Sequence, residues 1–225
     1  MGVATSLTPF GAETLSILAP YHRYDMLPWG HLAVGYLVYT VLVRVRGQRA
    51  PAGVPTLVLA LGTQLPDLVD KPLNWWFGIF DGRGIGHSLF AVTAVCLLVA
   101  FAAYWANRLD TAGALSVGLY THLLGDSYQA LLSGEFGRAA FLLWPLVPAP
   151  TYPKDSLFEH LDAWMAYLQA LPRLSPSQIM ASGFGFQLVL LLVLFGTWAL
   201  DGFPGVGTLW RFVTRRPADA TRISD

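Results

Sequence analysis

The sequence predicts an all-α protein, a polytopic membrane bundle of about five transmembrane helices, and three observations support this fold class. Of the 225 residues, 54% are hydrophobic and only 12% are charged, and the mean hydropathy is +0.49. An ordinary soluble domain has about 25% charged residues. The chain also carries eight Trp, nine Tyr and thirteen Phe, which suit a protein anchored at membrane interfaces. Alternating strand patterns and βα punctuation are absent, which excludes all-β and soluble α/β folds.

We expect the whole chain, residues 1–225, to form one membrane domain. Five segments are predicted to be membrane helices, at about 28–45, 54–69, 87–106, 112–132 and 184–201. The third and fifth are apolar runs of about spanning length. The other three contain His, Asp, Thr or Gln, so they have to turn these side chains toward a bundle interior rather than lipid.

A long loop region, residues 133–183, separates the fourth and fifth segments and contains a predicted amphipathic helix at 156–171. Ser156 and Glu159 form a capping box, and an apolar stripe follows them. This interfacial helix either covers a site at the membrane surface or simply packs on the bundle. Residues 139–147 are apolar but too short to span a membrane.

Arginine residues predict the orientation of the chain in an inner or plasma membrane. Eight of them fall on one side of the predicted bundle, at positions 44, 46, 49, 108, 211, 215, 216 and 222. The positive-inside rule places that side, with the tail at 202–225, in the cytoplasm. An odd number of spans then puts the N-terminus outside.

Five polar motifs interrupt or border the apolar segments, and this topology places them all near the outer face. They are His31; Asp67 with Asp70; His87; His122 with Asp126; and the pair Glu159–His160. Ionisable residues at membrane depth are expensive and are functional candidates by default. Histidine and carboxylate side chains are also the ligands of zinc and related divalent metals. We do not expect His160 itself to be a ligand.

The two carboxylate motifs have spacings that suit a metal site. His122 and Asp126 are four residues apart and share one helix face. Asp67 and Asp70 are three apart, and two close carboxylates repel unless a proton or cation lies between them. An alternative is that Asp70 pairs with Lys71 or caps a helix break at Pro72, which leaves only Asp67 functional.

Two further motifs have alternative interpretations in which they do not take part in a site. His87 follows the glycine-rich turn 81–86, which does not fit a dinucleotide or P-loop fingerprint, and it could be an interfacial histidine, as could His31. Arg83 in the same turn can bind a phosphate bidentately, or it can be a solvated surface residue.

Composition excludes several other kinds of site. Cys96 is the single cysteine, so an internal disulfide and a thiolate metal cluster are both excluded. The formal net charge of zero gives no indication of a nucleic-acid partner.

The ordered motifs resemble a known family. The set comprises His31, Pro66-Asp67-x-x-Asp70, Gly86-His87-Ser88-Leu89, His122-x-x-x-Asp126 and Trp144-Pro145. Over roughly residues 28–148 it resembles the prokaryotic inner-membrane-associated metal-dependent hydrolases, including archaeal members with a Pro-Asp-Leu-Val-Asp-Lys-Pro motif. That family is thought to be distantly similar to zinc-dependent phospholipase C and P1-type nucleases. The soluble phospholipases have a further metal site from later histidines, whereas this chain has only His160 after residue 122.

The resemblance implies a metal role for His31, Asp67, His87, His122 and Asp126, with Asp70 as a partner. Asp67, Asp70 and His122 are then the expected catalytic residues. The cofactor is a divalent metal, Zn²⁺ or else Mn²⁺ or Mg²⁺, with one or two ions. The expected partners are membrane lipid and a lipid or small-molecule phosphoester substrate. The alternatives are an ion or proton transporter and a structural membrane protein that binds a metal for stability, because the same His and Asp residues serve either purpose.

Overall fold

The computed structural model describes residues 26–48, 50–80, 82–151, 156–181 and 183–214, and this part of the chain is helical without strands. The prediction of an all-α fold is therefore confirmed. The elements are α2 (Pro28–Val45), α3 (Gly53–Gly62), α4 (Leu65–Phe77), η2 (Ile85–His87), α5 (Leu89–Trp105), α6 (Leu109–Leu132), η3 (Phe136–Leu143), α7 (Leu157–Ala170), η4 (Leu171–Arg173), α8 (Pro176–Ala181), α9 (Gly183–Leu200) and α10 (Val206–Thr214).

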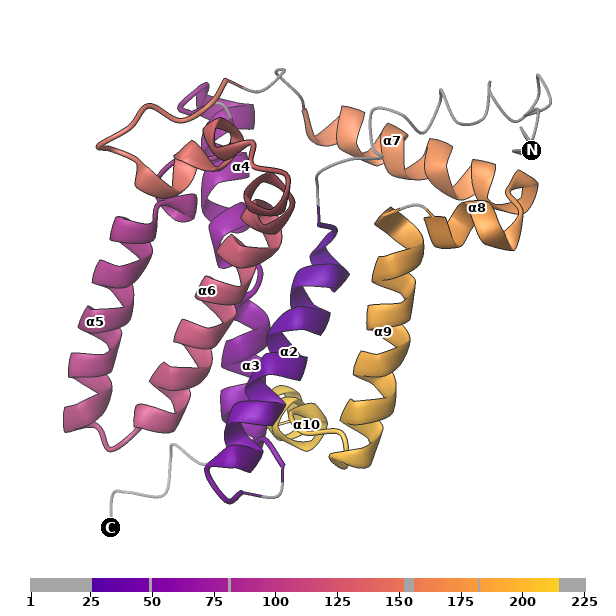
Figure 1. The fold of residues 1–225 in the computed structure, drawn as a ribbon. Helices are drawn as coiled ribbons and strands as arrows, with labels where there is room; N and C mark the ends of the chain where they lie inside the picture. Colours follow the sequence, from indigo (N-terminus) through magenta and orange to yellow (C-terminus); the bar gives the residue numbers. More distant parts are fainter. Residues whose placement is uncertain (1–25, 49, 81, 152–155, 182, 215–225) are drawn as a thin grey trace, which may run out of the picture.

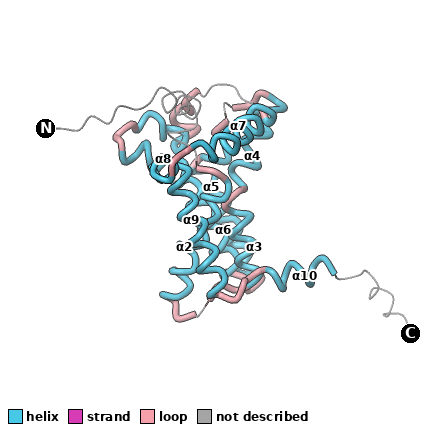
Figure 2. The backbone as a smooth tube through the Cα atoms, turned by 90° about the vertical axis from the view of Figure 1, so that its right-hand side faces the viewer, coloured by secondary structure: helices cyan, strands magenta, loops and turns pink. Residues whose placement is uncertain are grey.

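The helices of the bundle lie side by side, and the remaining described helices gather at the two ends of the bundle. Figure 1 shows α5, α6, α3, α2 and α9 in a row, with α4, α7 and α8 at the upper end and α10 at the lower end. Figure 2, turned by 90°, shows the same division. We call the end that carries α4 the site end and the end that carries α10 the far end.

The predicted second membrane helix, 54–69, is two helices rather than one. The first, α3, ends at Gly62, and α4 starts at Leu65 and continues to Phe77. Pro66 stands in the first turn of α4, where its missing N–H is tolerated, whereas one continuous helix would need that donor. Asp67 therefore lies in the first turn of a helix rather than at the end of one. Pro72 lies inside α4, and the helix continues through it to Phe77.

The remaining elements follow the sequence prediction with smaller differences. α7 occupies the predicted loop helix, and the backbone N–H of Glu159 donates to Ser156 Oγ at 3.2 Å, as the capping box requires. The short helix α8 and the amphipathic α10 were not predicted, and α10 falls in the segment expected to be a tail. None of the helices in the described part of the chain combines the length and the apolar character needed to cross a membrane.

Close backbone contact between α3 and α6 holds the middle of the bundle together. A Cβ atom at Gly118 of α6 would lie only 2.6 Å from the carbonyl oxygen of Leu59 in α3. A Cβ at Gly62 of α3 would in turn lie 2.9 Å from the carbonyl oxygen of Leu115. Small residues at such an interface let two helix backbones approach closely. This approach matters for function because α6 carries His122 one turn beyond Gly118.

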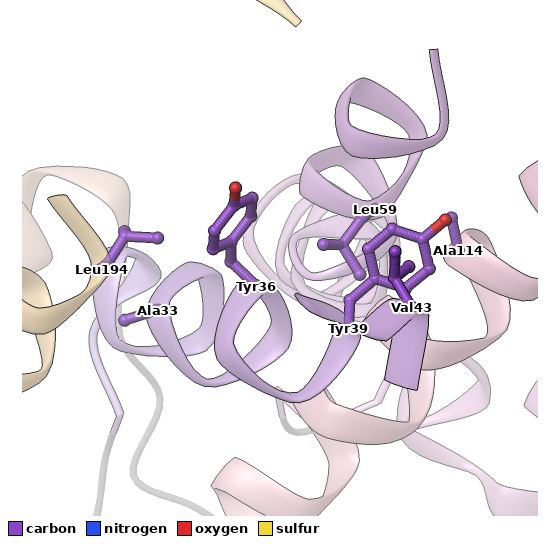
Figure 3. Close-up of a cluster of buried hydrophobic side chains, with 7 residues drawn as sticks. All are labelled: Ala33, Tyr36, Tyr39, Val43, Leu59, Ala114 and Leu194. Carbon is purple, nitrogen blue, oxygen red and sulfur yellow. The ribbon is translucent and has the colours of Figure 1, made fainter. Parts of the chain in front are cut away.

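The main apolar core surrounds α2, as Figure 3 shows. Ala33 and Tyr36 face Leu194 of α9 at one side of the cluster, while Tyr39 and Val43 lie toward the neighbouring helices. The latter pair shares the cluster with Leu59 of α3 and Ala114 of α6. α2 thus joins α9 to the closely packed α3–α6 pair.

A buried carboxylate joins α2 and α9 near the far end. Asp201, directly after α9, accepts hydrogen bonds from Tyr36 Oη at 2.7 Å and Thr40 Oγ1 at 3.0 Å. Its other oxygen lies 2.5 Å from Arg44 Nη2. Because its charge is matched by Arg44 and its oxygens accept hydrogen bonds, this carboxylate can be buried. Sequence analysis did not single out Asp201.

Substitution of Gly118 by Ala should destabilise the bundle, because its methyl group would collide with the backbone of Leu59. Overpacking of this kind costs about 1–3 kcal/mol. Gly113 on the same helix has open space around its Cβ position, so Gly113→Ala should be neutral or stabilising by up to about 1 kcal/mol. Thermal unfolding of the two variants in detergent, followed by circular dichroism, measures the difference. Equal melting temperatures would contradict the proposed helix contact.

Candidate metal centre

Four side chains from two helices and a turn meet at the site end. They are Asp67 in the first turn of α4, His87 in η2, and His122 and Asp126 on α6. One ligand atom from each residue lies within 4.8 Å of the others, so this group could hold a metal ion. Both histidines are fully buried. Two histidines and two carboxylates form a donor set typical of zinc and related divalent ions.

The break between α3 and α4 sets the orientation of His122. The last carbonyl groups of a helix lack partners within that helix, and the carbonyl of Thr63, directly after α3, lies 2.7 Å from His122 Nδ1. Because a carbonyl oxygen only accepts, Nδ1 must be the protonated nitrogen. The lone pair of neutral His122 is therefore on Nε2.

A carboxylate sets the orientation of His87 in the same way. Nδ1 of His87 lies 2.7 Å from Asp70 Oδ2, which accepts its proton, so the lone pair of neutral His87 is also on Nε2. The two Nε2 atoms of His87 and His122 are 3.1 Å apart. Two facing lone pairs at this distance repel unless a cation or a proton lies beside them. Metal-binding histidines commonly donate their other N–H to a carboxylate or carbonyl in this manner.

The two carboxylates of the group complete the ring of donors. Asp126 Oδ2 lies 3.2 Å from His87 Nε2 and 3.8 Å from His122 Nε2. Asp67 Oδ1 lies 3.6 Å and 3.9 Å from the same two atoms. Each carboxylate also has a cationic partner, since Lys71 Nζ is 2.7 Å from Asp67 Oδ2 and Arg83 Nε is 3.0 Å from Asp126 Oδ2.

Asp70 lies beside this group rather than in it, which differs from its predicted role as ligand or catalytic residue. Its side chain is 0% exposed. Oδ2 accepts the backbone N–H groups of Gly84 and His87 together with His87 Nδ1, and Oδ1 accepts the N–H of Gly86. With both oxygens used in this way, Asp70 holds the turn 84–87 against α4. The alternative pairing with Lys71 is also not observed, because Lys71 binds Asp67.

The turn can approach α4 because residue 86 is glycine. A Cβ atom there would lie 2.7 Å from the carbonyl oxygen of Pro66 and 3.2 Å from the Asp70 carboxylate. A larger residue would push the turn, and His87 with it, away from α4. Ser88 secures the other side of His87, because its hydroxyl donates to the carbonyl of Trp144.

His31 lies against the four-residue group without belonging to it. Its ring stacks on His122 with a centroid distance of 3.9 Å, and Nε2 lies 3.3 Å from Asp126 Oδ1 outside hydrogen-bond geometry. The side chain is 1% exposed, and neither ring nitrogen has a hydrogen-bond partner among the described residues. Buried polar groups are almost always satisfied, so an unsatisfied imidazole beside a carboxylate is a candidate donor for a further cation.

The remaining predicted residues are placed as follows. For Arg83 the sequence offered two roles, a phosphate ligand or a solvated surface residue. Its side chain lies beside the metal group, in contact with Asp126, and is 15% exposed. Glu159 lies on the exposed part of α7. The side chain of His160 lies outside the described residues.

Two contributors to the centre were not identified from the sequence. One is the carbonyl group of Thr63, which only the helix break makes available. The other is Phe141 of η3, fully buried, whose ring is 5.9 Å from that of His87 and 5.1 Å from the Arg83 guanidinium carbon. The sequence signal for η3 was an apolar segment too short to span a membrane, which did not indicate contact with the polar residues.

Comparison with protein families matches residues 26–203 to the family described as YdjM inner membrane protein. This range covers the site and all the described helices except α10. Comparisons with curated proteins and with solved structures gave no match. The distant similarity to zinc-dependent phospholipase C and P1-type nucleases thus stays a prediction.

Replacement of Asp70 by Asn should weaken metal binding without removing any of the four donors. An asparagine would present its NH₂ group to backbone N–H donors, so the turn 84–87 and His87 would lose their fixed position. Loss of such a contact typically lowers metal affinity tenfold to a hundredfold. Zinc titration of the purified variant measures this change. Asp110→Asn is the control, since Asp110 is exposed at the start of α6, and metal affinity unchanged in Asp70→Asn would contradict the positioning role.

Proposed function

The chain belongs to the YdjM inner membrane protein family, and we propose that it is a membrane-embedded, metal-dependent hydrolase that cleaves a phosphoester. One observation carries the proposal: the Nε2 atoms of His87 and His122 face each other at 3.1 Å, and both Nδ1 atoms are held by oxygen acceptors. This arrangement fixes the tautomer of both rings before any ion binds. It is the arrangement expected of a prepared metal site.

The residues present fit a divalent metal. His87 and His122 would bind it through Nε2, Asp67 through Oδ1 and Asp126 through Oδ2. When bound there, such a metal polarises a phosphoryl oxygen and lowers the pKa of water to about 7. The enclosing Thr63 carbonyl and Asp70 carboxylate keep the two rings in place.

Asp67 is the residue best placed to exchange a proton with substrate. Its side chain is 16% exposed, whereas His87 and His122 are fully enclosed. Lys71 holds its Oδ2 in position. Asp70 is unsuited to the role of general base, because its side chain is fully buried and holds the turn 84–87. We therefore assign proton acceptance to Asp67, which the sequence offered together with Asp70.

Exposed apolar side chains support a location in the membrane. On α5 they include Leu97, Leu98, Phe101 and Trp105, and on α9 they include Leu192, Phe195 and Leu200. Soluble proteins rarely expose apolar surface on this scale, and such surface marks contact with a membrane or a partner. We place the site end at the outer face, because the described arginines of the predicted cytoplasmic side lie at the far end, at positions 44, 46, 108 and 211.

A groove beside the site supports a substrate with a hydrocarbon portion. It has a volume of about 230 Å³ and almost no polar lining. Its walls include Pro66, Val69, Ile85, Gly86, Ala91 and Val95. Pro66 and Gly86 directly precede Asp67 and His87, so the groove borders two of the three segments that deliver donors. A lipid phosphoester is therefore the substrate that we favour.

The proposal predicts that the purified protein contains zinc or manganese and that Asp126→Asn and His122→Gln lose it. Each substitution removes one of four donors, so metal affinity should fall by more than the tenfold to hundredfold typical of outer contacts. Mass spectrometry of detergent-purified wild type, both variants and the control Asp110→Asn measures the content. Hydrolysis of bis(4-nitrophenyl) phosphate is then measured after reloading.

The outcomes separate the function classes. Metal together with hydrolysis that both variants abolish would support the proposal. Metal without hydrolysis of water-soluble or lipid phosphoesters would favour a structural metal site. No bound metal, even after reconstitution, would overturn the proposal and favour ion or proton transport.

His31 predicts the number of ions. With an ion in the four-residue group and a second between His31 Nε2 and Asp126 Oδ1, wild type should hold two ions per chain. His31→Gln should then hold one, because it removes the only described donor of the second position other than Asp126. Metal-to-protein stoichiometry in both proteins measures this. One ion in each would contradict the second position and leave the first intact.

A further inference from the structure

We propose that Arg83 is an oxyanion-binding residue, whose guanidinium binds the phosphoryl oxygens of a ligand held at the metal centre. The inference rests on the proposed function for the presence of a metal, and it goes beyond that function by naming the group that recognises the substrate. The ligand class is a phosphate mono- or diester, or inorganic phosphate itself.

Arg83 directly precedes the turn 84–87, and residues on both sides of it are held in place. The backbone N–H of Gly84 donates to Asp70 Oδ2 at 2.7 Å, and the preceding Phe80 ring contacts Trp144 edge to face at 5.2 Å. The guanidinium itself lies over the Phe141 ring, a contact that suits arginine. Arg83 is thus held in place before a ligand arrives, which reduces the entropy lost when the ligand binds.

Arg83 and Lys71 both pair with a carboxylate of the metal group, but they use different oxygens. Lys71 contacts Asp67 Oδ2, whereas Asp67 turns Oδ1 toward the two histidines. That pair can persist unchanged when a metal is bound. Arg83 contacts Asp126 Oδ2, which is the same oxygen that faces His87 and His122. Its guanidinium therefore lies one oxygen atom away from the position that a metal would occupy.

This position suits recognition of a phosphoryl group. A phosphoryl group with one oxygen bound to such a metal would have further oxygens available to neighbouring donors. Arginine carries its N–H groups in a planar fork that binds phosphate bidentately, which lysine cannot do. Fixed donors aimed at the charge that develops during transfer are often the largest contribution to catalysis. The side chain is buried enough to exclude most water yet remains 15% exposed.

A purely structural role for Arg83 makes a different prediction. If the guanidinium only oriented Asp126, its removal would misplace a metal donor and weaken metal binding. If it binds the ligand, its removal deletes a positive charge next to the metal, so metal affinity should stay equal or rise. Phosphate affinity should then fall without a loss of metal affinity. Metal and phosphate affinities together therefore discriminate the two roles.

The test uses full-length, detergent-purified protein loaded with zinc, and compares Arg83→Gln and Arg83→Lys with wild type. Arg138→Gln is the matched control, because it removes one positive charge from an exposed pair with Glu135 at 3.2 Å. Isothermal titration with inorganic phosphate gives the Kd of the anion, and zinc titration gives the Kd of the metal. KM and kcat for bis(4-nitrophenyl) phosphate are measured in parallel.

We expect Arg83→Gln to weaken phosphate binding at least tenfold and to raise KM, with zinc affinity unchanged or increased. Arg83→Lys should lie between this variant and wild type, and Arg138→Gln should match wild type. Arg83→Lys also keeps the test valid if Arg83→Gln does not fold. Micelles that contain a phosphatidyl lipid are added as a competitor. Displacement of phosphate assigns the subsite to a lipid headgroup, and no displacement assigns it to a water-soluble phosphoester.

Three results would overturn the inference: equal phosphate affinity in Arg83→Gln and wild type, no phosphate binding by zinc-loaded wild type, or a tenfold loss of zinc affinity in Arg83→Gln. Failure of the proposed function looks different. In that case wild type hydrolyses no phosphoester, while phosphate binding still depends on Arg83.

Discussion

The facing Nε2 atoms of His87 and His122 are the constraint around which the site end is organised. Each ring is locked by an acceptor on Nδ1, so neither can turn its lone pair away from the other. The acceptors come from different places: a carboxylate on α4 for His87, and a backbone carbonyl released by the break between α3 and α4 for His122. The helix break, the turn 84–87 and Asp70 are therefore parts of one arrangement. Together they direct two lone pairs at a position that could hold one cation.

This arrangement depends on packing farther down the bundle. His122 is delivered by α6, whose distance from α3 is set where Gly118 meets the backbone of Leu59. α2 packs against the same two helices through Tyr39 and Val43 and brings His31 to the stack with His122. Asp201 fixes the lower part of α2 to α9 through Tyr36 and Thr40. Apolar and small residues farther along the bundle therefore determine the positions of the candidate metal-binding side chains at the site end.

Charge balance distinguishes residues that otherwise look alike. Asp67, Asp70 and Asp126 are all carboxylates near the histidines, yet each has a different set of partners. Asp70 accepts hydrogen bonds from the turn 84–87, and Asp67 pairs with Lys71 through Oδ2. Asp126 lies between Arg83 and His31. The roles that we assign follow from these partners. In the proposed function Asp70 positions His87, Asp67 binds the metal and accepts a proton, and Asp126 joins the metal group to Arg83.

The sequence by itself determined the helical fold and the residue types of the site. The absence of alternating strand patterns excluded β folds, and the His122–Asp126 spacing on one helix face is local geometry that any α-helix imposes. The sequence could not separate the roles of Asp67 and Asp70, because two residues that are three positions apart on a helix point to the same side. Only the turn 84–87, which is remote in sequence, distinguishes them by binding the carboxylate of Asp70. It also could not assign Arg83, whose role depends on Asp126 forty-three residues away. Contacts between distant segments decide such roles, and tertiary packing alone creates those contacts.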